Sequence, residues 1–370
     1  MSLRLATFNV ENLMNRFDFS GFRNQLNQDR ALAIYDIKDE AEYRLLERAR
    51  AVAHTDDTRQ LTALAIAATR ADIICLQEID NIEALKAFEY GYLFKMVGEG
   101  YREKYVSTGN DSRGIDVAVM TRNETAHGEP IEFVRMTNHA HLTFGELGLH
   151  NAALAALGIQ PHDRIFRRDC MEVDFHIGGK PFTLYVLHLK SMGPPRNGFD
   201  GRTASMPVRM AEAAAVRRII EDRFGRDHAA NKLWAICGDL NDYRERVVIN
   251  GDSHSGYVFE PMKEEQSAVN VLLGGELCEN IVERRPEMDR WTLYHTRGPL
   301  ERHLCQLDYI LLSRRLAERN ALAVPDIIRN GQPWRTIFPQ GQEVDRYPRT
   351  GWDRPKASDH CPVAVTIDLV

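Results

Sequence analysis

Residues 233–244 read Leu233-Trp234-Ala235-Ile236-Cys237-Gly238-Asp239-Leu240-Asn241-Asp242-Tyr243-Arg244. The apolar start predicts a buried strand, and Gly238 lets the backbone turn without a Cβ clash. Asp239 and Asn241 are two residues apart, so an extended chain presents both side chains on one face. A carboxylate beside a carboxamide can hold a water and a phosphate oxygen together. Gly-Asp-x-Asn also suits a simple turn, so the rest of the chain must decide between the two interpretations.

The composition predicts a globular protein with a sizeable core. The chain has 370 residues, of which 44% are hydrophobic and 27% charged. This length permits one large domain or two ordinary ones. Because no interdomain linker is visible, we predict one domain over residues 1–370, with insertions at about 15–57 and 135–166. The turn signals at 191–207 predict a further irregular stretch.

No apolar run approaches the roughly 20 residues that span a membrane. The N-terminus shows no signal region, which predicts a cytoplasmic protein and leaves a processed exported form open. The six cysteines are far apart and form no Cys-x-x-Cys pair, so we expect buried thiols. The net charge of −6 argues against sequence-independent coating of DNA. It is compatible with carboxylates that hold a divalent metal.

Apolar runs and helical periodicity predict two packed sheets with helices outside, rather than a doubly wound sheet. The predicted strands lie at 3–10, 72–77, 115–121, 171–177, 182–189, 233–237, 307–313 and 361–369. The predicted helices lie at 41–54, 58–70 and 206–224.

Several other predicted strands also carry polar residues at their ends. These residues are Asn9, Glu78, His188, Asp308, Asp359 and His360. Each has an ordinary explanation, such as a turn cap, a helix start, a core histidine or a surface turn. Those explanations do not account for five strands with polar ends in addition to the Asp239 strand.

Together these residues form six motifs in a fixed order: Thr7-Phe8-Asn9, Leu76-Gln77-Glu78, Leu187-His188-Leu189-Lys190-Ser191, Gly238-Asp239-Leu240-Asn241, Leu307-Asp308-Tyr309 and Ser358-Asp359-His360-Cys361-Pro362-Val363. The set resembles the endonuclease/exonuclease/phosphatase superfamily. That family includes pancreatic-type deoxyribonucleases, AP endonucleases, neutral sphingomyelinases and inositol polyphosphate 5-phosphatases. The motifs extend from residue 5 to the C-terminus and leave only the two insertions uncovered.

The resemblance implies a four-layer α/β/β/α sandwich of two mixed sheets with the active site at one rim. It also implies an enzyme that hydrolyses a phosphoester with Mg²⁺ or Mn²⁺. Glu78 and Asp359 are the implied carboxylate ligands of the metal. Asn9 is implied either as a further oxygen ligand or as the residue that orients Glu78.

The resemblance also implies the catalytic roles. Asp239 would position the attacking water, and Asn241 would donate an amide N–H to a phosphate oxygen. His188, together with the metal, would neutralise charge on the phosphoryl oxygens. His360 would act as general base or phosphate contact, with Asp308 fixing its tautomer and orientation.

Further residues are implied around this centre. Asp116 is the candidate acidic partner of His188, the alternative being that Asp116 simply starts a strand. Four basic residues are candidates for contacts with substrate phosphates: Arg113, Arg168, Lys190 and Arg209. The ordinary alternative for each of the four is a solvated side chain.

Four functions compete. We predict a nuclease-like phosphodiesterase, with nucleic acid as one candidate substrate and no obligate protein partner. The alternative is a phosphatase or phosphodiesterase acting on a lipid or inositol phosphate headgroup. A binding module without chemistry is disfavoured because competent residues fill the catalytic positions. A Rossmann-type protein is excluded because no Gly-x-Gly-x-x-Gly follows a strand.

The motifs also distinguish the branches of the family. Tyr243 stands where inositol 5-phosphatases resemble one another in an arginine, and Gln306-Leu307-Asp308-Tyr309 replaces their Cys-Asp-Arg motif. The sequence offers no clear counterpart of the exposed aromatic hairpin typical of neutral sphingomyelinases. The negative charge disfavours the basic duplex-binding loops of AP endonucleases.

Overall fold

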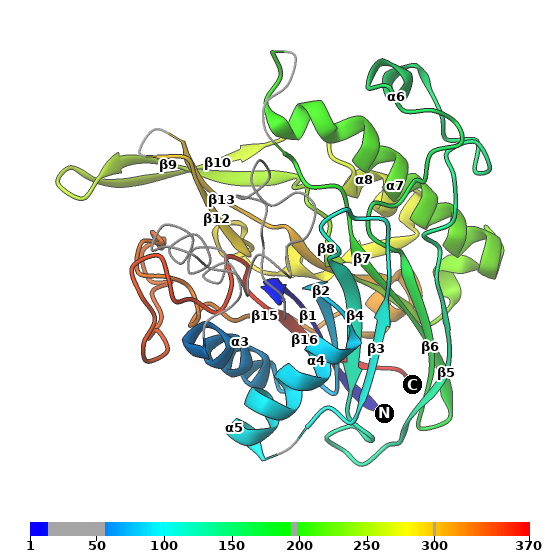
Figure 1. Ribbon diagram of the computed structural model, residues 1–370, viewed down its shortest axis with the longest axis horizontal. Helices are drawn as coiled ribbons and strands as arrows, with labels where there is room; N and C mark the ends of the chain where they lie inside the picture. The colour runs from blue at the N-terminus through cyan, green and yellow to red at the C-terminus, as the bar shows by residue number, and fades with distance from the viewer. Residues whose placement is uncertain (14–55, 99, 194–197, 299–300) are drawn as a thin grey trace, which may run out of the picture.

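Two six-stranded mixed sheets face each other, as predicted (Figure 1). The computed structural model describes residues 1–13, 56–98, 100–193, 198–298 and 301–370. The first sheet has the order β15 (Asp326–Ile327), β16 (Val363–Asp368), β1 (Ser2–Leu13), β2 (Ile73–Ile79), β4 (Asp116–Thr121), β3 (Glu103–Ser107). The second has the order β11 (Cys278–Asn280), β14 (Asp308–Ser313), β8 (Trp234–Asp239), β7 (Lys180–His188), β6 (Met171–Ile177), β5 (Ile131–Thr137).

Both sheets combine parallel and antiparallel neighbours. β1 runs parallel to β2 and antiparallel to β16, and β7 runs parallel to β8. The β1–β16 pairing joins Ser2 to Asp368. Because strands from opposite ends of the sequence share one sheet, we propose that residues 1–370 form a single domain.

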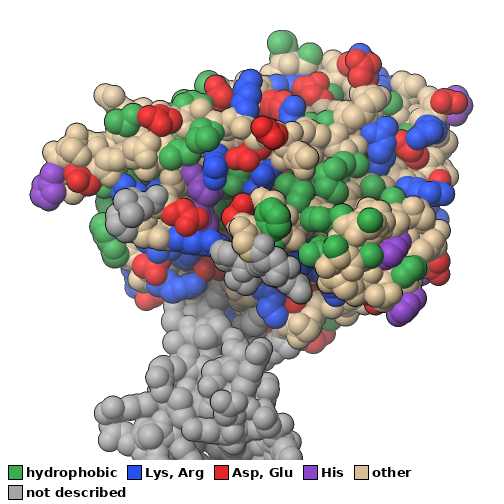
Figure 2. Space-filling model, turned by 90° about the horizontal axis from the view of Figure 1, so that it is seen from above, with side chains coloured by type: hydrophobic (Ala, Val, Ile, Leu, Met, Phe, Trp, Pro, Cys, Tyr) green, Lys and Arg blue, Asp and Glu red, His purple; other side chains and the backbone are tan. Residues whose placement is uncertain are grey.

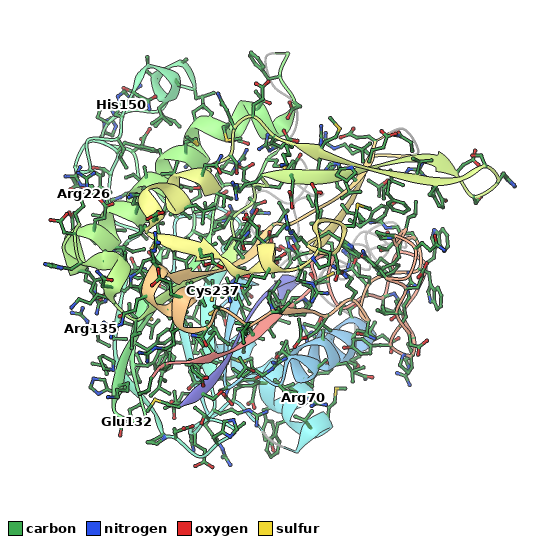
Figure 3. All side chains as sticks on the ribbon, turned by 180° about the vertical axis from the view of Figure 1, so that it is seen from behind. Arg70, Glu132, Arg135, His150, Arg226 and Cys237 are labelled. Atoms are coloured by element: carbon green, nitrogen blue, oxygen red, sulfur yellow. The ribbon has the colours of Figure 1, made fainter. Side chains whose placement is uncertain are left out.

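The main core lies between the two sheets. Alternate residues of facing strands, such as Leu5, Val119, Leu184 and Ile310, are fully buried in one cluster. Cys237 belongs to the same cluster and lies near the centre of the molecule (Figure 3). All six cysteines are buried and unpaired, which confirms that prediction.

Helices cover the outer face of each sheet and complete the four predicted layers (Figure 1). The helices are α3 (Asp56–Thr69), α4 (Ile82–Phe88), α5 (Lys95–Val97), α6 (Ala152–Ala156), α7 (Gly201–Phe224), α8 (Val269–Leu273) and α9 (Arg314–Arg319), with a π-helix at Glu89–Phe94 and 3-10 turns at Ala229–Asn231, Gly274–Glu276, Ile281–Arg284 and Glu287–Asp289. α3 and α4 pack on the first sheet, and α7 and α8 pack on the second. Within the described ranges, no helix is long and apolar enough to cross a membrane.

All eight predicted strands are present, as β1, β2, β4, β6, β7, β8, β14 and β16. The helices predicted at 58–70 and 206–224 are α3 and α7, whereas 41–54 and most of the 15–57 insertion lie outside the described residues. The irregular stretch predicted at 191–207 is wrong from Gly201 onward, because α7 begins there. Asp200 caps the helix by accepting hydrogen bonds from the N–H groups of Arg202 and Thr203.

A third sheet of four strands was not predicted. Its order is β10 (Gly256–Lys263), β9 (Glu245–Asp252), β13 (Arg302–Cys305), β12 (Leu293–Thr296). β9 and β10 form a hairpin that projects from the body of the molecule (Figure 1). Tyr257 and Val258 are exposed on it, so the protein has a projecting hairpin that the sequence did not reveal. The hairpin escaped prediction because most of its side chains are exposed, which removes the alternating apolar pattern.

The segment predicted as an insertion at 135–166 contains the end of β5 and helix α6. Its Phe144, Leu154 and Phe166 are buried in the same cluster as the inner face of α7. This segment therefore covers α7. A groove of about 740 Å³ lies between this segment, α7 and the base of the hairpin. Hydrophobic side chains gather on that face, as Figure 2 shows from above.

Candidate active site

Three adjacent strands of the second sheet align the predicted catalytic residues. His188 at the end of β7 is paired with Asp239 at the end of β8, and Asp239 is paired with Asp308 at the start of β14. A Cβ at Gly238 would lie 2.0 Å from the carbonyl oxygen of Leu187. Glycine is therefore required for β7 and β8 to approach each other closely beside Asp239.

Asp239 is held by two amide side chains. Its Oδ2 accepts hydrogen bonds from Asn9 Nδ2 and Asn241 Nδ2, both at 3.0 Å, and its Oδ1 accepts one from the Asn241 backbone N–H at 2.8 Å. Asn241 Nδ2 also donates to the carbonyl of Leu189 at 3.1 Å. Both amide hydrogens of Asn241 are thus used within the protein. Asn241 was predicted to donate to a phosphate oxygen. In the structure its amide instead donates to Asp239 and so orients that carboxylate.

Two imidazoles approach the same oxygen of Asp239. The distance to Asp239 Oδ2 is 3.5 Å from His188 Nε2 and 3.8 Å from His360 Nε2. The other nitrogen of His360, Nδ1, lies 2.8 Å from Asp308 Oδ2, which is the contact expected to fix its orientation. The buried carboxylate of Asp239 therefore lies close to two histidines, His188 at the end of β7 in the second sheet and His360 just before β16 in the first sheet.

These contacts shift the pKa values of the central pair. Burial raises the pKa of Asp239 to about 7, although the charge of His360 opposes the rise. Burial disfavours the charged form of His360, but Asp308 and Asp239 outweigh burial and raise the pKa of His360 well above its usual value. The site therefore favours a cationic His360 and a carboxyl group at Asp239 that titrates near neutrality.

Glu78 lies in a bulge of β2, where the register with β4 shifts between Gln77 and Ile79. Its backbone has φ 69°, a value that is strained for a residue other than glycine. The Asn12 N–H donates to Glu78 Oε2 at 2.9 Å, and Glu78 Oε1 lies 3.8 Å from His188 Nε2. Burial and the charge of Asp359 raise the pKa of Glu78. The bulge thus turns this carboxylate toward the histidines at the cost of backbone strain.

Glu11 was not predicted and connects Asp359 to the first sheet. Glu11 Oε2 accepts a hydrogen bond from the Asp359 backbone N–H at 3.1 Å and lies 3.1 Å from Lys356 Nζ, and Glu11 Oε1 pairs with Arg354. The sequence carried one signal, since Glu11 follows Asn9 by two residues. Glu11 itself has φ 51°, so this strand end is also strained.

Asp116 does not contact His188, contrary to its predicted role. Asp116 Oδ1 instead accepts the N–H of Gly109 at 2.9 Å. His188 Nδ1 is buried without a hydrogen-bond partner among the described residues. Burial, with the positive charge of Arg168 as the next cause, lowers the pKa of His188 well below its usual value. The neutral form of the His188 imidazole is therefore favoured, and its position is set by strand β7.

Three of the predicted cationic residues lie near the centre. Arg168 is buried, donates to the Leu189 carbonyl at 3.0 Å and pairs with Asp111 at 2.9 Å. Arg113 is half-exposed and also contacts Asp111, at 3.1 Å. The ammonium group of Lys190 donates to the Ser191 carbonyl at 3.0 Å. Asp111 thus holds two arginines beside His188, of which Arg113 is the more accessible to a substrate.

Arg209 is not placed to contact a substrate. Its side chain is fully buried in α7 and donates to Ser205 Oγ at 2.6 Å and to the carbonyls of Arg202 at 2.6 Å and Lys190 at 3.3 Å. Glu212, one turn later in α7, accepts the Lys190 N–H at 2.6 Å and the Arg167 N–H at 3.3 Å. Both residues therefore fix the loop that follows His188.

Replacing Glu212 by alanine should lower the free energy of unfolding by roughly 3 kcal/mol, because two buried N–H groups lose their acceptor. The displaced loop should also lower kcat by up to roughly 10²-fold, since His188 begins it. Chemical denaturation and steady-state kinetics measure the two effects. Glu221→Gln on the same helix removes an i,i+4 pair with Arg217 and should cost only about 0.3–0.5 kcal/mol. Equal losses in both variants would contradict the role of Glu212.

The family comparison agrees with this geometry. A model of the Endonuclease/Exonuclease/phosphatase family matches residues 6–360, a range that includes the first five motifs in full and the sixth as far as His360. The chain belongs to this family. It is therefore a hydrolase that acts on phosphoester bonds. A comparison with curated protein sequences gives no match.

Solved structures share the fold at low sequence identity. A humanised TDP2 from D. rerio with 14 mutations is 15% identical, has a TM-score of 0.50, and the match covers 99% of both chains. Truncated Caenorhabditis elegans TDP2 is 13% identical with a TM-score of 0.49, covering 99% of this chain and 98% of that one. The human Nocturnin catalytic domain is 14% identical with a TM-score of 0.48, covering 99% and 94%. At this level of identity the likeness of the D. rerio structure supports the four-layer fold alone.

Proposed function

We propose that this family member is a nuclease-like phosphodiesterase that depends on Mg²⁺ or Mn²⁺. One observation carries the proposal: His188 Nε2 and His360 Nε2 both lie within 4 Å of the same oxygen of Asp239. Two imidazoles and a carboxylate around one point can hold a water and the phosphoryl oxygens that it attacks.

The residues beside this centre fit a hard divalent cation. No group of three or more His, Cys, Asp or Glu residues forms a metal cage in the described part of the chain. Mg²⁺ does not require such a cage, because it is commonly bound by one or two carboxylates together with waters and substrate phosphates. Glu78 and Asp359 would be those carboxylates, and burial, together with the charge of Asp359, raises the pKa of Glu78, an effect that a bound cation would oppose. When bound, the metal would neutralise charge on the phosphoryl oxygens.

Asn9 contributes differently from a simple ligand. Its Oδ1 accepts the Glu11 N–H at 3.0 Å, and its Nδ2 donates to Asp239. An amide oxygen can accept a second interaction, so a metal contact is compatible with this arrangement. The orientation of Glu78, which was the other predicted role, belongs instead to the Asn12 N–H.

The chain's own residues would then divide the chemistry. Asp239 would orient the attacking water and accept its proton, a role suited to a carboxylate with a pKa near the working pH. His360, charged and held by Asp308, would donate a hydrogen bond to a phosphoryl oxygen. His188 would donate a second one from Nε2. Arg113 would contact a neighbouring phosphate of the substrate.

The environment of Tyr243 supports a nuclease-like substrate over an inositol phosphate. Tyr243 is buried, and the guanidinium of Arg202 stacks 4.5 Å from its ring centre. The position therefore offers no cation to a headgroup. A lipid phosphodiester is the second candidate, and the exposed β9–β10 hairpin favours it. Buried unpaired thiols support a reducing, cytoplasmic environment.

Hydrolysis assays should separate these functions. The substrates are bis(p-nitrophenyl) phosphate, single-stranded and duplex oligonucleotides, sphingomyelin and inositol phosphates, each with Mg²⁺, Mn²⁺ or EDTA. We expect metal-dependent cleavage of the simple diester and of oligonucleotides, and Glu78→Gln should raise the Mg²⁺ concentration at half-maximal rate. Cleavage that survives EDTA would contradict the metal role. Cleavage of sphingomyelin without oligonucleotide cleavage would favour the lipid function.

A further inference from the structure

Two of the four tryptophans of the chain are buried, and the other two are exposed on one segment. Trp234 and Trp291 lie in the cores, whereas Trp334 is 55% exposed and Trp352 is 72% exposed. Exposed tryptophan is uncommon without a partner, because the indole ring buries a large apolar area. Both exposed rings belong to the segment 329–356, which precedes the Asp359-His360 motif and lies beside β15 and α3 (Figure 1).

The backbone holds the two tryptophans next to each other. The Trp334 N–H donates to the Gly351 carbonyl at 3.0 Å, and the Arg335 N–H donates to the Trp352 carbonyl at 2.9 Å. Trp334 Nε1 donates to the Thr350 carbonyl at 3.0 Å. The two tryptophans are therefore carried by two backbone segments that hydrogen-bond to each other, so their relative position is set before any ligand arrives.

One face of Trp334 is already supported from within the protein. The guanidinium of Arg346 lies 4.4 Å from the ring centre of Trp334 and 4.9 Å from that of Phe338. The same guanidinium donates to backbone carbonyls of the segment, including that of Pro333. Arg346 thus holds the Trp334 ring in place from within the protein, and the exposed part of the ring stays accessible to a ligand.

The segment is joined directly to the candidate active site. Arg354, two residues after Trp352, pairs with Glu11, whose carboxylate accepts the Asp359 N–H at 3.1 Å. Thr62 of α3 also donates to the Ala357 carbonyl at 2.7 Å. These contacts connect the segment that carries Trp352 to the Asp359-His360 motif.

The segment is basic in an acidic protein. The chain has a net charge of −6, but residues 329–356 carry six positive side chains against three negative ones. These are Arg329, Arg335, Arg346, Arg349, Arg354 and Lys356, against Glu343, Asp345 and Asp353. Five of these cations pair with carboxylates, whereas Arg346, whose guanidinium lies against the Trp334 ring, donates only to backbone carbonyls among the described residues. This remaining positive charge beside an exposed aromatic ring suits a polyanion whose bases are unpaired.

We propose that Trp334 and Trp352 form a stacking platform for the bases of a single-stranded nucleic acid whose scissile phosphate lies at Asp239 and His360. This proposal rests on the proposed nuclease-like function and adds its substrate class. Base stacking on an aromatic side chain is tolerant of sequence, because every base has a π face. The platform would favour unpaired bases, since a duplex conceals those faces.

The test compares a substrate with bases and one without. For Trp352→Ala, KM for a single-stranded dT12 oligonucleotide should rise roughly 5- to 150-fold, the effect of losing one base–aromatic stack. The rate on bis(p-nitrophenyl) phosphate should stay within about twofold. Trp352→Phe should recover most of the lost affinity because it retains a ring. Tyr90→Ala removes another exposed aromatic side chain, on the π-helix Glu89–Phe94. It should change neither KM for dT12 nor the rate on bis(p-nitrophenyl) phosphate.

Binding without hydrolysis keeps this test separate from the proposed function. In EDTA, dT12 should quench the tryptophan fluorescence of the wild-type protein, and an abasic oligomer should quench it less. In Trp352→Ala the two oligomers should quench the fluorescence equally. Quenching without oligonucleotide cleavage would support the platform and contradict the nuclease function. Equal binding of dT12 and abasic oligomer would overturn the platform. The platform would also be overturned if Trp352→Ala lost binding to phosphatidylserine vesicles but kept its binding to dT12. That result would assign the rings to a membrane surface.

Discussion

Replacing Asp239 by alanine should lower kcat for phosphodiester hydrolysis by roughly 10²–10⁴-fold, the range expected for a positioned acid or base. The carboxylate lies where both imidazoles and both orienting amides meet, so no neighbouring side chain can replace it. Steady-state kinetics on bis(p-nitrophenyl) phosphate measure the effect, and near-ultraviolet circular dichroism checks that the fold survives. Asp222→Asn, an exposed carboxylate on α7, should leave kcat unchanged.

A double-mutant cycle sharpens this prediction. Asn9→Ala should lower kcat in the wild-type background, because Asn9 Nδ2 holds Asp239 Oδ2. In the Asp239→Ala background the same substitution should have little further effect, since residues that act as one unit are strongly non-additive. Additive losses would show that Asn9 acts independently of Asp239, for example through the metal alone.

Replacing His360 by alanine should also lower kcat by roughly 10²–10⁴-fold. Asp308→Asn should produce much of this loss while leaving the imidazole in place, because the Nδ1 contact at 2.8 Å fixes both tautomer and ring orientation. The double variant should be no slower than His360→Ala. The measurement is kcat on the same small diester, so that substrate binding at remote sites does not contribute.

The third sheet provides a matched control for that prediction. His295 also contacts a carboxylate, with its Nε2 3.3 Å from Glu301 Oε1, but it lies outside the cluster around Asp239. His295→Ala should therefore retain the wild-type kcat. If His360→Ala kept its rate within about threefold, His360 would be a structural residue and the cationic contact to the phosphoryl group would be lost from the mechanism.

The sequence predicted the central sheets because their pattern is local. An apolar run that ends on a polar residue indicates both a buried strand and the place where that strand ends, as at Leu187-His188 and Cys237-Gly238-Asp239. The third sheet gave no such pattern, since β9 and β10 expose most of their side chains. The start of α7 was hidden by turn residues such as Asp200, which act here as a helix cap.

The partners of the site residues were harder to predict than the residues themselves. Asp116 was expected beside His188, but it accepts a hydrogen bond from the N–H of Gly109, in the loop between β3 and β4 of its own sheet. Arg209 is a charged residue on a helix, and nothing local indicated that three groups of the protein would occupy its guanidinium. Glu11 joins the two ends of the sequence, and such a contact leaves only a weak trace in the order of residues.

The sequence by itself determined the strands, the polar rim and the family, because hydrophobic periodicity and motif order are properties of neighbouring residues. The tertiary structure decided which groups meet: the two imidazoles at Asp239, the Glu78 carboxylate beside His188, and the Trp334 backbone beside that of Gly351. Each of these contacts joins residues that are not neighbours in the sequence. Their geometry follows from how two twisted sheets pack, which no single stretch of the chain encodes.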